Sequence, residues 1–299
     1  MLNGWGDHPL VQQTLQEASD ALGEDVGLLI KEGPKEALAL TTNTQPVMLV
    51  AGVAAFRVWM AEVGIAPAAV AGHSLGEYSA LVAAGSLTLQ QAAPLVRLRA
   101  QAMQEAVPVG VGAMAAILGM DAAKVRSICS DVTAAFAPGS AEVVEAVNFN
   151  DPSQTVIAGS KAAVDRACVE LKAQGAKRAL LLPVSAPFHS SLMRPAADRL
   201  QLALQELTLM VPQIPLVNNV DVAVETDVQR IADALVRQAY GPVRWVETVQ
   251  AIKARSISHL VECGPGKVLA GMVKRIDAEL TGTPLYDPQT LEDVKGLLA

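Results

Sequence analysis

The first third of the chain consists mainly of segments in which apolar residues recur at helical spacing. One short apolar run, residues 66–71, interrupts them and predicts a buried strand. Directly after it, residues 77–84 continue as a helix that Gly85 ends. The other predicted helices span residues 8–22, 35–40, 45–63 and 88–107, with Asp7, Thr44 and Thr88 as the expected N-caps of three of them.

The most apolar part of the chain is the segment 46–63, within the predicted helix 45–63. It is apolar on nearly all sides, which is typical of a helix buried in a protein core. It carries Arg57 and Glu62, and the chain lacks the basic start of a signal peptide. We therefore predict a core helix here and no membrane span.

The pattern changes at Gly112, where short strands and helices follow in β-α-β-β-α-β order. This order is typical of the split βαβ arrangement of a ferredoxin-like unit. The unit is compact enough to be a subdomain inserted into a larger domain. Its predicted strands span residues 113–118, 143–148, 155–158 and 179–183, and its helices span 121–131 and 162–174.

After residue 184 the chain returns to longer helices that alternate with single strands. Alternation of this kind predicts an α/β fold with a mostly parallel sheet covered on both faces. We therefore expect a core of residues 1–111 and 185–299, with the ferredoxin-like subdomain at 112–184. The predicted helices span residues 191–207, 227–239 and 243–254, and the strands span 214–218 and 257–262.

Composition narrows the class of protein. With 299 residues, 51% of them hydrophobic, the chain has enough apolar material for a large core. Its net charge of −7 argues against nucleic acid as the main partner. Cys129, Cys168 and Cys263 are widely spaced and form no C-x-x-C pattern, which fits a reducing, cytoplasmic location without a structural metal.

The candidate chemistry starts at Gly72-His73-Ser74-Leu75-Gly76, directly after the predicted strand 66–71. Gly-x-Ser-x-Gly between a strand and a helix is the pattern of a nucleophile elbow, in which a tight turn exposes the serine hydroxyl. The start of the following helix adds a positive dipole beneath it. The alternative is an ordinary turn serine.

A serine nucleophile needs a base, and the chain has four histidines. His8 lies in a helix and His259 in a predicted buried strand, so structural roles suit both. His73 adjoins Ser74 and therefore points to the opposite side of an extended strand. His189, in a Pro- and Ser-rich loop, is left as the base or as an ordinary loop histidine. No Asp or Glu stands in an obvious loop before it, which weakens a simple hydrolase; a backbone carbonyl can orient a histidine instead.

Two arginines, Arg97 and Arg99, lie on the helix at 88–107, and their spacing puts them on different faces. An arginine that points inward would need an anion, and its planar fork matches a carboxylate. From the residues alone, two solvated arginines are the simpler interpretation.

Taken together, seven motifs across nearly the whole chain make it resemble the malonyl-CoA:acyl carrier protein transacylases. The combination is far more specific than the Gly-x-Ser-x-Gly pattern alone. The motifs are Gly72–Leu81, Gln101–Gln104, Gly112–Ala116, Val147–Asn150, Pro183–His189, Val217–Val220 and Gly264–Leu269.

The resemblance implies a role for each matching position. Ser74 matches the serine that becomes acylated, and His189 matches its general base. The main-chain carbonyl of Gln238 would orient that histidine, and Leu75 would supply an oxyanion-hole amide. On the substrate side, the resemblance implies that Arg99 binds the malonyl carboxylate, with Phe188, His73 and Asn148 as further contacts. The implied fold is an α/β-hydrolase-like core with an inserted ferredoxin-like subdomain.

The resemblance also implies the partners. Malonyl-CoA donates the acyl group, the phosphopantetheine thiol of acyl carrier protein receives it, and no cofactor is needed. Because acyl carrier proteins of this family are acidic, we expect a basic docking patch, with Lys177, Arg178, Lys274 and Arg275 as candidates. A monomer is expected.

Proteins of that family begin with a strand and a Gly-Gln-Gly-Ser-Gln loop that supplies a second oxyanion amide, and Leu2 aligns just beyond this loop. We therefore expect one of two oxyanion amides and an open sheet edge or apolar slot. A late start, a trimmed chain or an impaired protein would each account for it. The rival functions are a serine thioesterase or esterase, and a weakly active module that binds acyl carrier protein; a polyketide role would differ only in pathway.

Overall fold

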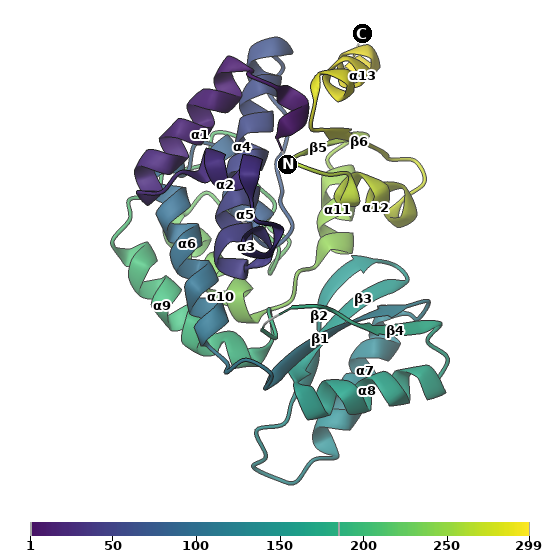
Figure 1. Cartoon of the computed structure of the whole chain (residues 1–299). Helices are drawn as coiled ribbons and strands as arrows, with labels where there is room; N and C mark the ends of the chain where they lie inside the picture. Colours follow the sequence, from purple (N-terminus) through teal and green to yellow (C-terminus); the bar gives the residue numbers. More distant parts are fainter. Residues whose placement is uncertain (1, 185, 299) are drawn as a thin grey trace.

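A computed structural model of the protein describes residues 2–184 and 186–298. In Figure 1, a group of helices lies on the left, a small sheet with its own helices lies below, and a second small sheet with further helices lies at the upper right. The helices are α1 (Pro9–Leu22), α2 (Val26–Glu32), α3 (Lys35–Ala39), α4 (Thr41–Glu62), α5 (Gly76–Ala83), α6 (Leu89–Glu105), α7 (Ala122–Ala134), α8 (Lys161–Ala173), α9 (Arg194–Gln205), α10 (Val228–Tyr240), α11 (Trp245–Lys253), α12 (Val268–Ile276) and α13 (Pro288–Leu298), with 3-10 turns η1 (Asn3–Trp5) and η2 (Ser191–Met193).

Helix α4 forms the centre of the largest apolar cluster, where it packs against α1, α5 and α6. It is long and apolar enough to cross a membrane, but 67% of its most apolar window is buried inside the protein. The neighbouring helices therefore account for its apolar surface, as predicted for a core helix.

The expected N-caps meet different outcomes. Thr88 caps α6, as predicted, and the structure adds a capping box between Thr88 and Gln91. Asp7 is not a cap, because α1 begins at Pro9 with His8 before it, and a proline at this position needs no N–H partner. Thr44 is not a cap either, since α4 starts three residues earlier and the Thr44 hydroxyl donates to the carbonyl of Leu40 at 3.0 Å.

The lower unit in Figure 1 is a four-stranded antiparallel sheet with the order β2-β3-β1-β4. Helices α7 and α8 pack on it around a separate apolar cluster. The element order β-α-β-β-α-β is the one that the sequence predicted, while the division of the chain at 112 and 184 stays a prediction. The strands are β1 (Gly112–Leu118), β2 (Val144–Asp151), β3 (Gln154–Ser160) and β4 (Arg178–Leu181).

The parallel sheet of the core is shorter than predicted. Over the described residues, its extended pairing is confined to β5 (His259–Cys263) with β6 (Thr281–Leu285). The runs 66–71 and 214–218 form a parallel bridge at Val70 and Leu216 and no longer ladder. Pro215 accepts from the Val70 N–H at 2.8 Å but has no N–H of its own to extend the pairing. The α/β class holds, and most of the strand pairing is antiparallel.

The run 66–71 and strand β5 each pack between the same two apolar clusters. Val70 and Val261 pack on the large cluster around α4, whereas Ala71 and Leu260 pack on a second cluster around Trp245. Over the described residues, β5 is paired with β6 alone, and its residues are half-buried or exposed. The edge of β5 that faces away from β6 therefore has no strand partner among the described residues.

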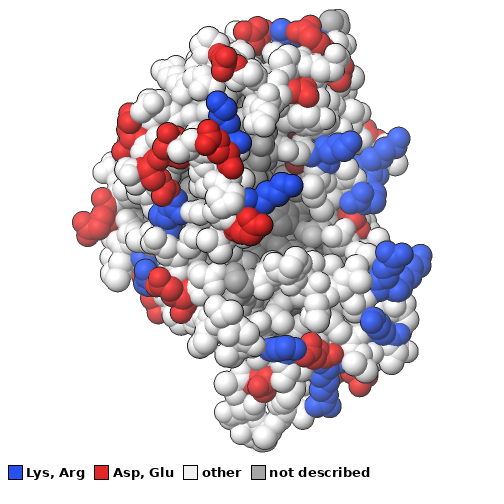
Figure 2. Space-filling view, viewed as in Figure 1, with Lys and Arg blue, Asp and Glu red and all other residues white. Residues whose placement is uncertain are grey.

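Charge is unevenly distributed over the surface. Figure 2 shows acidic side chains over the helical part on the left, whereas Lys and Arg gather along the right-hand side. Figure 1 places α12 and the α8–β4 side of the small sheet there. The negative net charge thus coexists with a basic side.

Candidate active site

Ser74 lies in a strained turn between the Val70 bridge and the first turn of α5. Its φ of +52° is in the left-handed region, which a residue other than glycine adopts only where its surroundings hold it. A Cβ on Gly72 would lie 1.9 Å from the carbonyl carbon of Gly76, so this position requires glycine. A Cβ on Gly76 would meet nothing within 4 Å. The turn therefore needs the first glycine of the pattern for packing, but not the second.

His189 is placed to act as the base of Ser74. Its Nε2 atom lies 2.7 Å from the Ser74 hydroxyl, and its Nδ1 atom lies 2.8 Å from the main-chain oxygen of Gln238. A carbonyl only accepts, so Nδ1 carries the proton and Nε2 is free to accept from the serine. His189 is buried and also has a left-handed backbone, with φ +65°. The carbonyl thus takes the orienting position that an Asp or Glu occupies in a hydrolase triad.

Burial and the nearby charge of Arg99 lower the pKa of His189 to about 3. The imidazole is therefore neutral throughout the range in which an ordinary histidine titrates. A neutral imidazole is the form that accepts the serine proton.

This pKa predicts the acid side of the pH profile. With malonyl-pantetheine, which has no phosphate to titrate, kcat/KM is expected to stay flat from about pH 8 to about pH 5 and to fall only below that, as the base becomes protonated. Initial rates across that range test this. An acid limb centred near the ordinary histidine value of 6.5 would contradict a neutral buried base.

Arg99 is the arginine that points inward. It is 2% exposed, and its guanidinium donates to the side-chain oxygens of Gln45 and Gln238 and to the Ser74 hydroxyl at 3.2 Å. Arg97 instead contacts Asn43 and Glu24 on another face. The interpretation that both arginines are solvated is thus wrong for Arg99, because the face of α6 that carries Arg99 packs against α4.

The hydrogen-bond partners of Arg99 are all neutral. Its Nε atom is buried and has no hydrogen-bond partner among the described residues. Burial lowers the pKa of Arg99, while the charge of Glu77 acts in the opposite direction. A buried guanidinium with a spare donor beside a reactive hydroxyl is suited to an incoming carboxylate.

The remaining candidates lie around this centre. His73 does not contact Ser74; its Nε2 atom lies 2.8 Å from Asn150 Oδ1, and its ring packs edge-on against Trp245. Asn148 is buried on β2. Phe188 packs where two apolar clusters meet. Leu75 is the residue before α5, where main-chain N–H groups have no partner within the helix.

The other two histidines lie elsewhere. His8 precedes α1 and stacks edge-on with Trp5. His259 lies in β5 but is exposed, which corrects the expectation of a buried strand position, because β5 begins there at the sheet end. No cluster of three or more His, Cys, Asp or Glu suited to a metal occurs in the described ranges.

Two buried residues of the site did not emerge from the sequence. Asn219 accepts the Ser74 N–H at 2.7 Å through its side-chain oxygen and donates to the Gly72 carbonyl at 2.7 Å. Glu77 accepts from the main-chain N–H of Asn219 at 2.9 Å. In the sequence, these two residues stand out only because they lie in the motifs Gly72–Leu81 and Val217–Val220. The motifs do not reveal which residues they contact.

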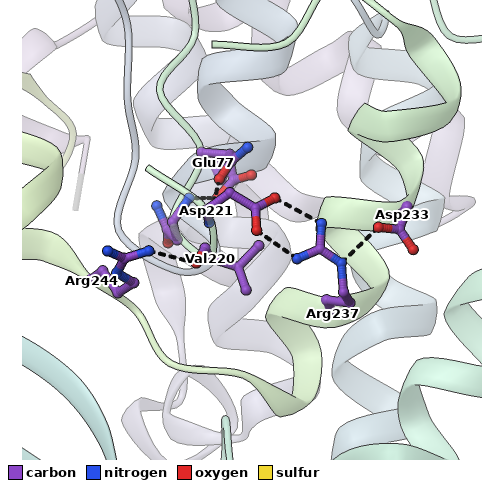
Figure 3. A network of polar contacts seen from close by, with 8 residues as sticks. Glu77, Val220, Asp221, Asp233, Arg237 and Arg244 are labelled. Carbon is purple, nitrogen blue, oxygen red and sulfur yellow. Dashed lines mark hydrogen bonds and ion pairs between the residues drawn. The ribbon is translucent and has the colours of Figure 1, made fainter. Parts of the chain in front are cut away.

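An ionic network lies beside this site. Figure 3 shows Asp221 facing Arg237 on α10, with Asp233 on the other side of the guanidinium. Arg237 donates to both oxygens of Asp221, each at 2.7 Å. The bidentate pair ties the loop that carries Asn219 to the helix turn that carries Gln238.

Comparison with known proteins gives the family of this chain. The sequence profile of the acyl transferase domain family matches residues 6–279, and the chain belongs to this family. The malonyl CoA-acyl carrier protein transacylase of Escherichia coli K12 is 51% identical over 284 residues, which are 95% of this chain and 90% of that protein.

Solved structures give the same result. The acyl-carrier-protein S-malonyltransferase of Burkholderia pseudomallei superposes with a TM-score of 0.95 at 57% identity, covering 99% of this chain and 94% of that one. A malonyl-transacylase solved in complex with a type II polyketide acyl-carrier protein has a TM-score of 0.93 at 49% identity, covering 97% and 92% of the two chains.

Proposed function

We propose that this protein transfers the malonyl group of malonyl-CoA to the phosphopantetheine thiol of acyl carrier protein through a malonyl-Ser74 intermediate. One observation carries the proposal: the Ser74 hydroxyl lies 2.7 Å from the imidazole of the buried His189 and 3.2 Å from the guanidinium of the buried Arg99. The proposal assigns these three side chains the roles of nucleophile, base and carboxylate partner. The relatives named above support the choice of substrates.

In the first half-reaction, His189 accepts the Ser74 proton as the serine oxygen attacks the thioester carbonyl. The Leu75 N–H stabilises the oxyanion at the elbow. When the intermediate collapses, the C–S bond breaks and the His189 proton passes to the departing thiolate. CoA leaves as a thiol, and malonyl-Ser74 remains.

The second half-reaction reverses these roles. The phosphopantetheine thiol gives its proton to His189 and attacks the serine ester, and the proton returns to Ser74 as its C–O bond breaks. Every step uses side chains and main-chain groups of this protein, so the proposed reaction needs no cofactor. Phe188, His73 and Asn148 are proposed to line the acyl-binding side.

Initial-rate kinetics test the proposal. Varying malonyl-CoA at several concentrations of holo acyl carrier protein is expected to give the parallel double-reciprocal lines of a ping-pong mechanism. Release of free malonate without acyl carrier protein, at a rate equal to transfer, would favour a serine thioesterase. Binding of acyl carrier protein without turnover would favour a binding module.

We propose that acyl carrier protein docks on the basic side seen in Figure 2. Lys274 and Arg275 lie exposed on α12, and Lys177 and Arg178 lie exposed before and at the start of β4. Arg275 already pairs with Asp151 at 2.8 Å, so Lys274 is the freer of the two charges on α12.

Reversing two of these charges should weaken the docking of acyl carrier protein and leave the acylation of Ser74 unaffected. Lys274→Glu combined with Lys177→Glu is expected to lower kcat/KM for acyl carrier protein about tenfold at low salt, with a smaller difference at high salt, because exposed charges act mainly on association. Serine acylation by malonyl-CoA should be unchanged. Equal loss in both half-reactions would contradict a docking role.

We also propose a cytoplasmic location for the protein and a division of its chain into a core and an inserted subdomain. Cys129, Cys168 and Cys263 are free thiols, which is in keeping with a reducing cytoplasm. We propose that residues 112–184 form the inserted subdomain and that 1–111 and 185–299 form the acyltransferase core.

A further inference from the structure

Glu77 is a buried carboxylate at the centre of the site. It lies in the first turn of α5 and is 2% exposed. One of its oxygens, Oε2, accepts two hydrogen bonds of 2.9 Å, from the main-chain N–H of Asn219 and from the side-chain amide of Gln238. No Lys or Arg of the described ranges has a side-chain nitrogen within 4.0 Å of its carboxylate oxygens.

Through Gln238, Glu77 is connected to both the base and the arginine. The main-chain oxygen of Gln238 accepts from His189 at 2.8 Å, and its side-chain oxygen accepts from Arg99 at 3.1 Å. The same side chain donates to the main-chain oxygen of Ser74 at 3.0 Å. Gln238 itself is fully buried, so its contacts are made within the protein.

Through Asn219, Glu77 is connected to the nucleophile. Asn219 is fully buried and binds both the Ser74 N–H and the Gly72 carbonyl with its side-chain amide. The hydrogen bond to Glu77 fixes the main chain of Asn219, from which that amide projects. The strained turn at Ser74 is thus held from a neighbouring loop.

The orientation of the Gln238 amide matters because its two ends differ. Arg99 has only donors, so the oxygen of Gln238 must face it. A reversed amide would place N–H groups against the guanidinium and an oxygen against the carboxylate of Glu77. The acceptors Glu77 and Ser74 at the amino end therefore determine which end meets Arg99.

We propose that Glu77 is a positioning residue that holds His189, Arg99 and Ser74 in one working geometry by accepting from Gln238 and Asn219. The proposal rests on the roles proposed above for those three residues. Glu77 does not touch the substrate in this scheme, and it acts through the two amide residues alone.

The charge of Glu77 is not what this role needs. Burial raises its pKa to about 7, while its hydrogen bonds and Arg99 act in the opposite direction and Asp221 adds to the rise. A protonated carboxyl still keeps a carbonyl oxygen that accepts hydrogen bonds. The position of the acceptor atom is therefore the feature to test.

Two conservative variants separate acceptor position from charge. Glu77→Gln keeps the length and an acceptor oxygen but loses the charge, whereas Glu77→Asp keeps the charge and shortens the side chain by one carbon. We expect the Gln variant to retain acylation within about fivefold of wild type. The Asp variant should lose about 10²-fold, because a displacement of about 1 Å in a positioned group costs that much.

The selectivity for malonyl over acetyl groups provides a readout that loss of stability would not change. In Glu77→Asp it should fall together with the acylation rate, since the shifted Gln238 contacts both His189 and Arg99. Leu81→Ala is the matched control: Leu81 is fully buried one turn further along α5, in the apolar cluster. It should lower Tm while the folded protein keeps its selectivity.

Single-turnover acylation by malonyl-CoA and acetyl-CoA, measured with Tm for each variant, gives the result. An Asp variant as active as the Gln variant or more so, or an Asp variant with unchanged selectivity, would overturn the proposal. Wild-type acylation at Ser74, measured alongside, tests the proposed function separately, so its failure is distinguishable from failure at Glu77.

Discussion

Replacing Ser74 with alanine is expected to reduce malonyl transfer by at least about 10⁴-fold and to remove the acyl-enzyme entirely. Ser74 is the proposed nucleophile, and over the described residues its hydroxyl is the one that the imidazole of His189 contacts. Single-turnover transfer from malonyl-CoA to acyl carrier protein, with intact-mass analysis of the enzyme, measures both effects.

Ser79→Ala is the control for this substitution. Ser79 lies on α5, half-buried and beside Gly52 of α4, and has no part in the site. Its rate should match wild type. A Ser74→Ala enzyme that still carried a malonyl group would place the nucleophile elsewhere and contradict the mechanism.

Arg99→Ala should remove the preference for malonyl over acetyl groups. We expect kcat/KM for malonyl-CoA to fall about 10²- to 10³-fold, because loss of one partner of a buried charge pair costs on the order of 3–4 kcal/mol. Acetyl-CoA has no carboxylate to lose, so its rate should change far less. Arg99→Lys should resemble alanine more than wild type, since an ammonium does not reproduce the planar fork.

The neighbouring arginine supplies the matched control. Arg97→Ala removes the same charge two residues away, on a face of α6 that binds Asn43 and Glu24. Its selectivity should equal that of wild type, as measured by competition between malonyl-CoA and acetyl-CoA. If Arg99→Ala retained the malonyl preference, the carboxylate would be recognised by another group.

Features with a local cause were predictable from the sequence. The capping box at Thr88 and Gln91 lies within four residues, and the β-α-β-β-α-β order follows from periodicity alone. The elbow at Ser74 follows from one glycine that packing demands.

Features that depend on distant residues were not predictable from local pattern. The pairing of Ser74 with His189 joins residues 115 positions apart. The sequence cannot single out the main-chain carbonyl of Gln238, because every residue has such a carbonyl. The resemblance supplied these roles. The single bridge at Val70 was missed because apolar content does not reveal where Pro215 stops the ladder.

Glu77 is a further residue whose role depends on distant contacts and could not be predicted from local pattern. A glutamate after a Gly-x-Ser-x-Gly pattern looks like an ordinary first-turn acid that favours the helix dipole. Only its 2% exposure and its two hydrogen bonds to the loop and to α10 identify it as part of the site.

The central claim is that the malonyl group passes through Ser74. The most direct measurement mixes wild-type protein with malonyl-CoA, removes free nucleotide, maps the modified peptide by mass spectrometry and then adds holo acyl carrier protein. We expect one malonyl group on the Ser74 peptide, and we expect it to move to the phosphopantetheine thiol. A malonyl group on another residue, or one lost to water and never found on acyl carrier protein, would contradict it.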